Sequence, residues 1–144
     1  MSNPARRALY GEWLARQERG EMYVAVAEVD GVLVGSRCLD LVCGAEDVAY
    51  GFGAHVLPEW RRRGVASAME KHLEAVAIAR GKRRCRSRAV KHNALAIRWH
   101  EAVGDVCIGE DVARWTEPDG TEVERECWIF ERWFRDDGQG RPAR

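Results

Sequence analysis

Apolar and polar positions alternate in short runs through the first third of the chain, a period of two that is typical of strands. Asp30 and Gly31 separate the first two runs, and this pair predicts a two-residue hairpin because both positions tolerate positive φ. We therefore expect three strands in an antiparallel meander. The alternating runs occupy residues 22–29, 32–43 and 48–56.

Helical spacing of apolar residues appears in three other segments, at 5–19, 65–80 and 94–103. In the first of these, the stripe expected to face the core contains Leu9, Trp13 and Leu14. Asn93 is a good N-cap for the third helix. Further strands are predicted at 84–90, 106–116 and 121–134.

Helices inserted between strands predict an α/β (α+β) fold, with a mixed, mostly antiparallel sheet of about six strands flanked by helices. The length of 144 residues fits one domain, which we place at residues 1–134. The remainder, 135–144, is rich in polar residues and glycine, and it is expected to be a disordered tail.

Composition changes this picture little. Twenty-three basic residues balance 23 acidic ones, so the overall charge favours neither nucleic acid nor a membrane as partner. No apolar run approaches the ~18 residues of a membrane span, and no signal peptide is evident, so we expect a cytoplasmic protein. The five cysteines form no C-x-x-C pair and the four histidines show no zinc-ligand spacing, so we expect reduced thiols and no metal.

The segment 56–66 carries the most chemical information, because it joins a strand to a long helix. Pro58 ends strand pairing, and the residues that follow lead into the helix with backbone N–H groups that lack carbonyl partners. Gly64 lets a ligand approach the backbone, and Ala66 keeps that approach open. Such a loop binds an anion such as a pyrophosphate, with three arginines adding positive charge.

This segment resembles the acetyl-CoA signature of the GCN5-related N-acetyltransferase (GNAT) family, V-x-P-x-x-R-x-x-G-x-[GA]. The matching residues are Val56, Pro58, Arg61, Gly64 and Ala66. A second family motif, N-x-x-A-x-x-x-Y-x-x-x-G-F, is matched in part by Asn93, Ala96 and Gly104. The resemblance covers roughly residues 22–134 and implies that acetyl-CoA is bound by Val56, Leu57, Arg61, Arg62, Arg63, Gly64, Val65, Ala66, Ser67 and Asn93.

The chain departs from the family pattern in three respects. The first strand and first helix of the family are missing before the helix at 5–19. Asp105 replaces the aromatic residue that follows the motif glycine, and His100 stands where the family usually has a tyrosine. By resemblance, His100 would stabilise or protonate the departing thiolate, although packing within a helix is an equally good explanation for a histidine there.

Candidates for the general base are His55, Tyr50 and Glu28. The two former residues lie on the strand that leads to the cofactor loop, and Glu28 is an acidic residue at the parity of apolar Val24 and Val26. A chain of water molecules without a single base, or side chains that are simply solvated, would fit the sequence as well.

The resemblance implies an acetyl-CoA-dependent N-acetyltransferase that transfers acetyl directly to a primary amine of a small molecule or a protein. The alternative is a non-catalytic acyl-CoA-binding or regulatory module. A third interpretation uses the basic run at 80–91 for nucleic acid, but the run has no interleaved aromatic residue, and a solvated sheet edge explains it better. A tryptophan-rich last strand and the shortened N-terminus favour a homodimer.

Overall fold

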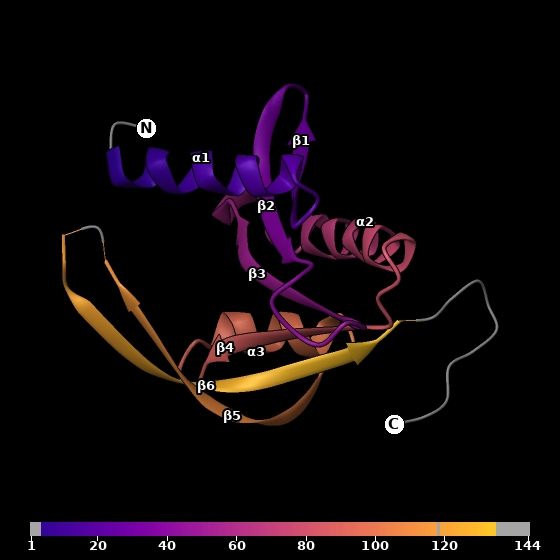
Figure 1. Ribbon diagram of the computed structural model, residues 1–144. Helices are drawn as coiled ribbons and strands as arrows, with labels where there is room; N and C mark the ends of the chain where they lie inside the picture. Colours follow the sequence, from indigo (N-terminus) through magenta and orange to yellow (C-terminus); the bar gives the residue numbers. More distant parts are fainter. Residues whose placement is uncertain (1–3, 118, 135–144) are drawn as a thin grey trace.

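The computed structural model describes residues 4–117 and 119–134, and the predicted tail at 135–144 lies outside the described residues. Within the described residues, three α-helices, a short 3₁₀ helix and six strands follow one another (Figure 1). In order they are α1 (Pro4–Glu18), β1 (Met22–Val29), β2 (Val32–Asp40), β3 (Val48–Val56), η1 (Pro58–Trp60), α2 (Val65–Ala79), β4 (Arg84–Val90), α3 (Ala94–Ala102), β5 (Val106–Thr116) and β6 (Glu122–Trp133).

The six strands form one sheet in the order β1-β2-β3-β4-β6-β5. All neighbouring strands are antiparallel except β3 and β4, which are parallel. The predicted α+β class and the mixed, mostly antiparallel sheet of six strands are therefore confirmed. The parallel pair is possible because α2 carries the chain back to the end of the sheet at which β3 began.

Local sequence signals account for most element boundaries. Asp30 and Gly31 have φ angles of 50° and 80°, as the predicted two-residue hairpin between β1 and β2 requires. The Asn93 side chain accepts a hydrogen bond from the Ala96 backbone N–H at 3.1 Å, which caps α3 as predicted. The sequence pattern does not predict the 3₁₀ helix η1 at Pro58–Trp60.

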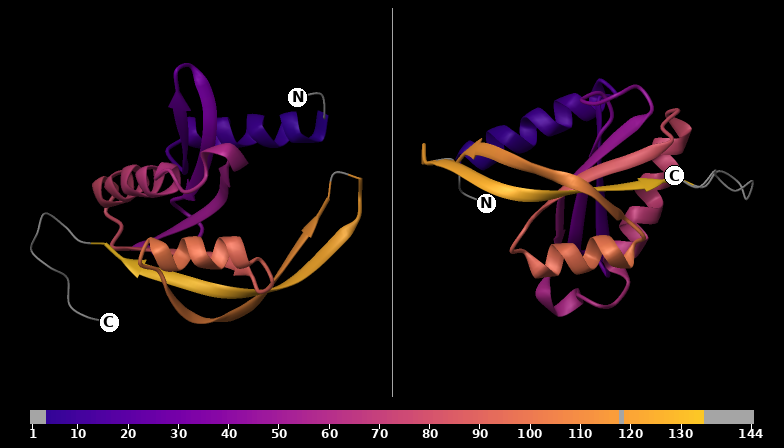
Figure 2. Two further views of the ribbon diagram at one scale, coloured as in Figure 1. Left: turned by 180° about the vertical axis from the view of Figure 1, so that it is seen from behind. Right: turned by 90° about the horizontal axis from the view of Figure 1, so that it is seen from below.

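The helices cover the sheet from both faces (Figure 2). On the α2 face, a core cluster joins Leu73 and Ala77 of the helix to Leu39, Ala49 and Cys85 of three strands. On the opposite face, α1 packs mainly against β1. The main core therefore lies between α2 and the centre of the sheet, which fixes where α2 begins relative to β3.

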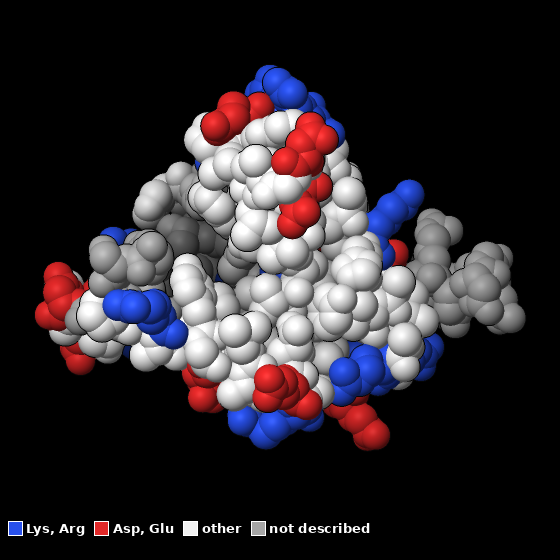
Figure 3. Space-filling model, turned by 90° about the horizontal axis from the view of Figure 1, so that it is seen from above, with Lys and Arg blue, Asp and Glu red and all other residues white. Residues whose placement is uncertain are grey.

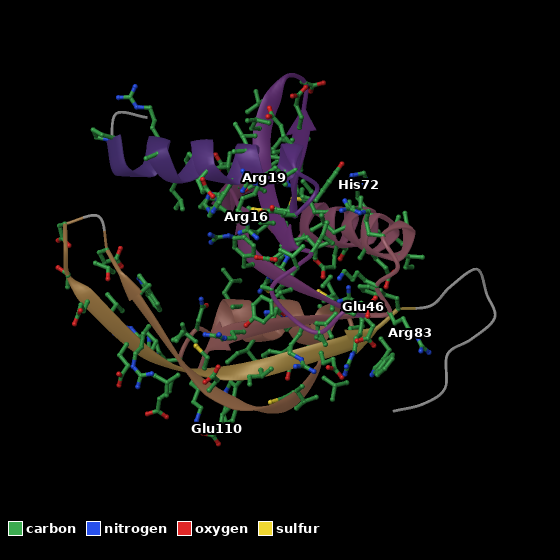
Figure 4. All side chains as sticks on the ribbon, viewed as in Figure 1. Arg16, Arg19, Glu46, His72, Arg83 and Glu110 are labelled. Atoms are coloured by element: carbon green, nitrogen blue, oxygen red, sulfur yellow. The ribbon has the colours of Figure 1, made fainter. Side chains whose placement is uncertain are left out.

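The stripe predicted for α1 is only partly correct, because Leu9 and Leu14 are 46% and 57% exposed. Trp13 does pack on the sheet, with its ring centroid 5.5 Å from that of Phe52. The helix is otherwise held near its C-terminal end, where Arg16 lies on the side that faces the sheet (Figure 4). Its first turns extend past β1, β2 and β3, so these three strands do not cover them (Figure 1).

All five cysteines are free, as the sequence predicts. Cys38, Cys85 and Cys127 are buried, whereas Cys43 and Cys107 are exposed. Burial raises the pKa of Cys38 to about 11 and that of Cys85 to about 12, so both thiols stay protonated at neutral pH. These two side chains act as small apolar core residues rather than as nucleophiles.

The basic run at 80–91 does not form a sheet edge, because β4 lies between β3 and β6 in the middle of the sheet. The prediction of a solvated edge is wrong because strand order depends on long-range pairing that a local charge pattern does not encode. The run is also partly neutralised: Glu131 pairs with Arg84 and Arg86, and Glu110 pairs with Lys91 at 2.7 Å. Acidic and basic groups are interspersed on the face shown in Figure 3.

Within residues 4–117 and 119–134, no helix has the length and apolar character needed to cross a membrane. Nor do these residues bring three or more cysteine, histidine or carboxylate side chains together in a group that would hold a metal ion.

Candidate functional site

The parallel strands β3 and β4 separate soon after they meet. Only three residue pairs join them, the last being Tyr50 with Arg86, although both strands continue for several residues. A cavity of about 1340 Å³ opens between the diverging strands and extends to α3 and the start of α2. This volume exceeds the ~300–1,000 Å³ of ordinary small-molecule pockets, so the cavity suits an extended ligand.

An irregularity in β3 accompanies this separation. The pairing of β2 with β3 shifts register between Ser36 and Cys38, opposite the part of β3 that contains Gly53. Gly53 has a φ of 69°, which an L-residue with a side chain rarely adopts. A bulge bends its strand, so this feature turns the second half of β3 away from β4.

The loop from β3 to α2 is shaped to bind an anion. Gly64 occupies the N-cap of α2 with φ 82°, and no side chain caps the helix. The first N–H groups of the helix therefore have no intrahelical acceptor and carry the positive end of the helix dipole. Arg61 and Arg62 line the same end of the cavity, and a Cβ built on Gly64 would meet no atom within 4 Å. The loop thus combines positive charge, free N–H groups and open space.

The structure brings most of the predicted cofactor residues to this cavity. Eight of the ten line it, namely Val56, Arg61, Arg62, Gly64, Val65, Ala66, Ser67 and Asn93. The other two lie elsewhere. The backbone N–H of Leu57 donates to the Val34 carbonyl at 2.9 Å, and the Arg63 guanidinium lies 5.0 Å from the centre of the Trp60 ring.

The predicted base candidates separate clearly by position. His55 is exposed and lines the cavity, and Tyr50 is half-buried and lines it as well. Burial raises the pKa of Tyr50 despite the nearby Arg88, so its hydroxyl is protonated at neutral pH. The alternation along β1 predicts that Glu28 faces inward, but its side chain is exposed and lies outside the cavity. The pairing of β1 with β2 shifts register between Ala27 and Glu28, which breaks the alternation at this point.

His100 lines the cavity from α3 and is 3% exposed. Its ring stacks on Phe130 of β6 with centroids 4.5 Å apart. Its Nδ1 lies 2.6 Å from an Asp105 carboxylate oxygen and 3.4 Å from the Ser87 hydroxyl. Because Nδ1 is occupied by these partners, Nε2 is the ring nitrogen left for a ligand.

Asp105 belongs to a chain of buried ion pairs that crosses the molecule. Its second carboxylate oxygen accepts a hydrogen bond from Arg132 of β6. Arg132 also donates to Glu70 of α2 at 3.0 Å, and Glu70 in turn accepts a bond of 3.2 Å from Arg37 of β2. All of these carboxylates are at least nine-tenths buried, so each needs the arginine contacts that it makes.

Sequence reasoning missed most of this network. Asp105 stands out in the sequence as a departure from the family motif, but its contact with His100 depends on the turn after α3. An arginine inside the apolar β2 segment VLVGSRCLD is a usable signal, because an inward-facing arginine needs buried partners. The partners themselves, Glu70 and Arg132, come from distant parts of the chain and give no local signal.

The comparisons with known proteins agree with this geometry. The model of the acetyltransferase (GNAT) family matches residues 2–104. The chain belongs to the GNAT acetyltransferase family. Acetyl-CoA is the cosubstrate of this family. No curated protein sequence matches the chain.

Solved structures show that the GNAT fold extends over nearly all of the chain. The yncA protein of Salmonella typhimurium, solved with its cofactor acetyl-CoA, is 18% identical, with a TM-score of 0.69 over 95% of this chain and 78% of that one. The ribosomal-protein-S18-alanine N-acetyltransferase of Escherichia coli is 19% identical, with a TM-score of 0.65 over 92% and 81%. The PaiA N-acetyltransferase of Thermoplasma acidophilum, solved with coenzyme A, is 17% identical, with a TM-score of 0.69 over 88% and 69%.

Proposed function

We propose that this GNAT protein is an N-acetyltransferase that transfers the acetyl group of acetyl-CoA directly to a primary amine. The observation that carries the proposal is the large cavity between β3 and β4, which runs from the uncapped start of α2 to His100 of α3. One continuous space therefore offers a phosphate site at one end and titratable side chains at the other.

The residues present fit acetyl-CoA. Arg61, Arg62 and the free N–H groups at the start of α2 would hold the pyrophosphate, since they supply both charge and hydrogen-bond donors. The open space over Gly64 permits the close approach that these donors need. When bound, acetyl-CoA supplies an activated thioester and a thiolate leaving group.

We assign His100 the role of stabilising and protonating the thiolate. Asp105 holds Nδ1 of the ring, so Nε2 is the nitrogen left to donate its N–H to the sulfur when the ring is protonated. The carboxylate of Asp105 faces the positive charge of that protonated ring. Asp105 is thus a positioning residue, whereas His100 would touch the reacting sulfur.

For the attacking amine, we propose His55 as the group that removes the proton, directly or through water. It is the candidate base that is both exposed to solvent and placed on the cavity wall. Tyr50 lies on the same wall, but its protonated hydroxyl suits it to donate a hydrogen bond rather than to accept a proton.

The acceptor is proposed to be an amine of a small molecule or a protein amino group. Two of the similar structures, from Escherichia coli and Brucella melitensis, are named as ribosomal-protein-alanine N-acetyltransferases, which makes protein N-termini a reasonable class to screen.

The sequence also favours a homodimer. Light scattering on the purified protein tests this oligomeric state.

The decisive experiment is calorimetric titration with acetyl-CoA, using Gly64→Trp and Gly81→Trp as a matched pair. Both glycines have φ near 80°, and a Cβ added to either would meet no atom within 4 Å, so the two substitutions impose similar backbone strain. Only Gly64 lines the cavity. We expect one-site binding in the wild-type protein and in the Gly81→Trp control, and loss of binding in Gly64→Trp.

A thiol-release assay over a panel of amines then tests catalysis. Amine-dependent release of CoA supports the enzyme, whereas binding without release with any amine favours the acyl-CoA-binding module instead. If the wild-type protein fails to bind acetyl-CoA at low salt, the proposed function is wrong.

A further inference from the structure

The large cavity passes through the sheet, because residues on both faces line it. On the face that carries α3, the Ser87 hydroxyl of β4 lies 3.4 Å from Nδ1 of His100. Successive side chains of a strand point to opposite faces, so Arg88, the next residue, points to the face that carries α1. His100 and Arg88 both line the cavity. The space between β3 and β4 therefore connects the two faces of the sheet.

Two aromatic residues of β3 line the cavity on the α1 face. Phe52 packs against Trp13 of α1, with ring centroids 5.5 Å apart, and Tyr50 has the same parity in the strand. The guanidinium carbon of Arg88 lies 5.9 Å from the centre of the Tyr50 ring. Tyr50 of β3 and Arg88 of β4 are therefore neighbours on the two walls of the cavity, on its α1 side.

The guanidinium of Arg88 has hydrogen-bond donors available to a ligand. Its Nε lies 3.6 Å from a carboxylate oxygen of Asp111, which is longer than a hydrogen bond, and the two side chains are 39% and 46% exposed. Within residues 4–117 and 119–134 this is its only ion pair, and exposed pairs contribute little to stability. By contrast, Arg86 on the same face donates two hydrogen bonds to Glu131, at 2.7 and 3.2 Å. Arg88 is thus the arginine of β4 that a ligand can engage.

Tyr50 supplies a second donor beside this guanidinium. Burial raises the pKa of its hydroxyl even though the positive charge of Arg88 lowers it, so the hydroxyl keeps its proton at neutral pH. A carboxylate has two oxygens that only accept hydrogen bonds, and a guanidinium binds such a group with charge-assisted bonds. An ammonium group offers no acceptor and would face the positive charge of Arg88. The two side chains therefore suit an anionic group on the acceptor.

We propose that Arg88 and Tyr50 bind a carboxylate of the acceptor, which is then a free α-amino acid or a similarly short amino carboxylate. This inference rests on the proposed function, because it takes the acceptor to be an amine that attacks acetyl-CoA in this cavity. Ser87 and Arg88 are consecutive in β4, so His100 and the guanidinium lie on opposite sides of one short stretch of strand. That placement favours a short spacer between the amine and the carboxylate.

The acceptor panel isolates the carboxylate. Each standard amino acid is compared with its own amide and with the amine that remains when its carboxyl group is removed, and putrescine represents the diamines. Thiol release is measured at saturating acetyl-CoA. The amine of an amino acid amide has a lower pKa than that of the amino acid and is the more available nucleophile at neutral pH. A preference for the amino acid therefore reports recognition of its carboxylate.

Arg88→Gln removes the charge, Tyr50→Phe removes the hydroxyl, and Arg114→Gln is the matched control. Arg114 is also a strand arginine in an exposed ion pair, with Glu124 at 2.8 Å, but it does not line the cavity. We expect wild type and Arg114→Gln to use the best amino acid with a kcat/KM at least about tenfold above that of its amide.

Arg88→Gln should raise the KM for that amino acid by about 30-fold and abolish the preference over the amide, because a charged hydrogen-bond donor is lost. Tyr50→Phe should raise the same KM by about fivefold, as expected for an uncharged donor. Both variants should keep the affinity for acetyl-CoA within about threefold in calorimetry, which also shows that they are folded.

The possible failures have different meanings. If Arg88→Gln binds acetyl-CoA normally and keeps the preference for the amino acid, Arg88 does not recognise the carboxylate and the inference is wrong. If wild type turns over amides or putrescine faster than every amino acid, the acceptor is not an amino carboxylate, and the inference is overturned while the proposed function stands. If no amine causes thiol release, the proposed function itself fails, and this inference fails with it.

Discussion

At the scale of single residues, two departures from the family motif prove to be neighbours. His100 replaces the usual tyrosine, Asp105 replaces the usual aromatic residue, and their side chains meet at 2.6 Å. A tyrosine hydroxyl needs no carboxylate to act as a proton donor, whereas an imidazole benefits from a group that fixes its tautomer. The two replacements are therefore consistent with one shared role, in which Asp105 orients the histidine that replaces the tyrosine.

We expect His100→Phe to lower kcat by about 100-fold while leaving the affinity for acetyl-CoA within about threefold, because general acid catalysis typically contributes this much. The measurement is steady-state kinetics with the best amine from the screen, alongside calorimetry. The double variant His100→Tyr/Asp105→Phe, which restores the family pattern, should recover more activity than His100→Tyr alone. Equal activity in the two would argue against a coupled pair.

Asp105→Asn should lower kcat by about tenfold while leaving the affinity for acetyl-CoA within about threefold, since the ring would lose the partner that fixes its tautomer. Steady-state kinetics together with calorimetry separate this role from a structural one. A variant with wild-type kcat and only a lower melting temperature would show that Asp105 simply stabilises the fold through Arg132.

At the scale of elements, α1 is attached to the sheet by polar contacts of Arg16 and Gln17 as well as by Trp13. The guanidinium of Arg16 donates to the Asp40 carboxylate at 2.7 Å, and the N–H groups of Val42 and Cys43 each donate to it at 3.0 Å. Burial alone would raise the pKa of Asp40, but these hydrogen bonds outweigh it and hold the pKa below its usual value. Asp40 therefore stabilises the folded state when it is charged.

Because the folded-state pKa is the lower one, this contribution is present above the unfolded pKa of ~3.9 and is lost as pH falls through the folded value. We expect Asp40→Asn to lower the free energy of unfolding by about 1–2 kcal/mol at pH 7. The difference from wild type should shrink as the pH falls below about 4. Urea unfolding at several pH values measures it.

Glu12→Gln is the matched control for Asp40→Asn. The pair that it breaks joins Glu12 of α1 to Arg19, the residue after the helix, at 3.8 Å, and both side chains are more than half exposed. We expect no measurable change in stability at any pH, since exposed ion pairs contribute little. If Asp40→Asn lost as much stability at pH 3 as at pH 7, the charged form of Asp40 would not be what attaches α1 to the sheet.

The sequence predicted the order and type of all six strands and three α-helices, because each carries a local signal of period, turn or cap. The N-cap role of Asn93 was also predicted correctly, since it follows from the backbone around it. The predictions that failed concern contacts between elements that are distant in the sequence. The exposure of Leu9 and Leu14, the central place of β4, and the partners of Arg37 all depend on which elements pack together, and no short segment specifies that.

At the scale of the whole molecule, the sheet consists of two antiparallel halves, β1-β2-β3 and β4-β6-β5. The strands that join the halves, β3 and β4, are 9 and 7 residues long, but only three residue pairs connect them. The α2 face adds core contacts from Ala49 to Cys85, and the ion pairs from Arg37 to Asp105 cross the same boundary. The cavity thus lies between the two neighbouring strands that share the fewest residue pairs in the sheet.

A ligand that contacts both walls of this cavity should stabilise the fold as a whole. At 100 times its dissociation constant, acetyl-CoA is expected to add about 2.7 kcal/mol to the free energy of unfolding. For a chain of this size we expect a rise in melting temperature of roughly 5–10 °C, measured by scanning fluorimetry. Gly81→Trp should show the same rise and Gly64→Trp none.

The separation of β3 and β4 also leaves two strand edges facing each other inside the sheet, beyond the last pair of Tyr50 and Arg86. Unpaired strand edges accept foreign strands, and proteins normally protect them. Under the proposed function, an extended cosubstrate would lie between these edges and would keep other chains out for as long as it is bound. The supply of acetyl-CoA in a cell would then govern not only how fast this protein works but also how long it escapes aggregation.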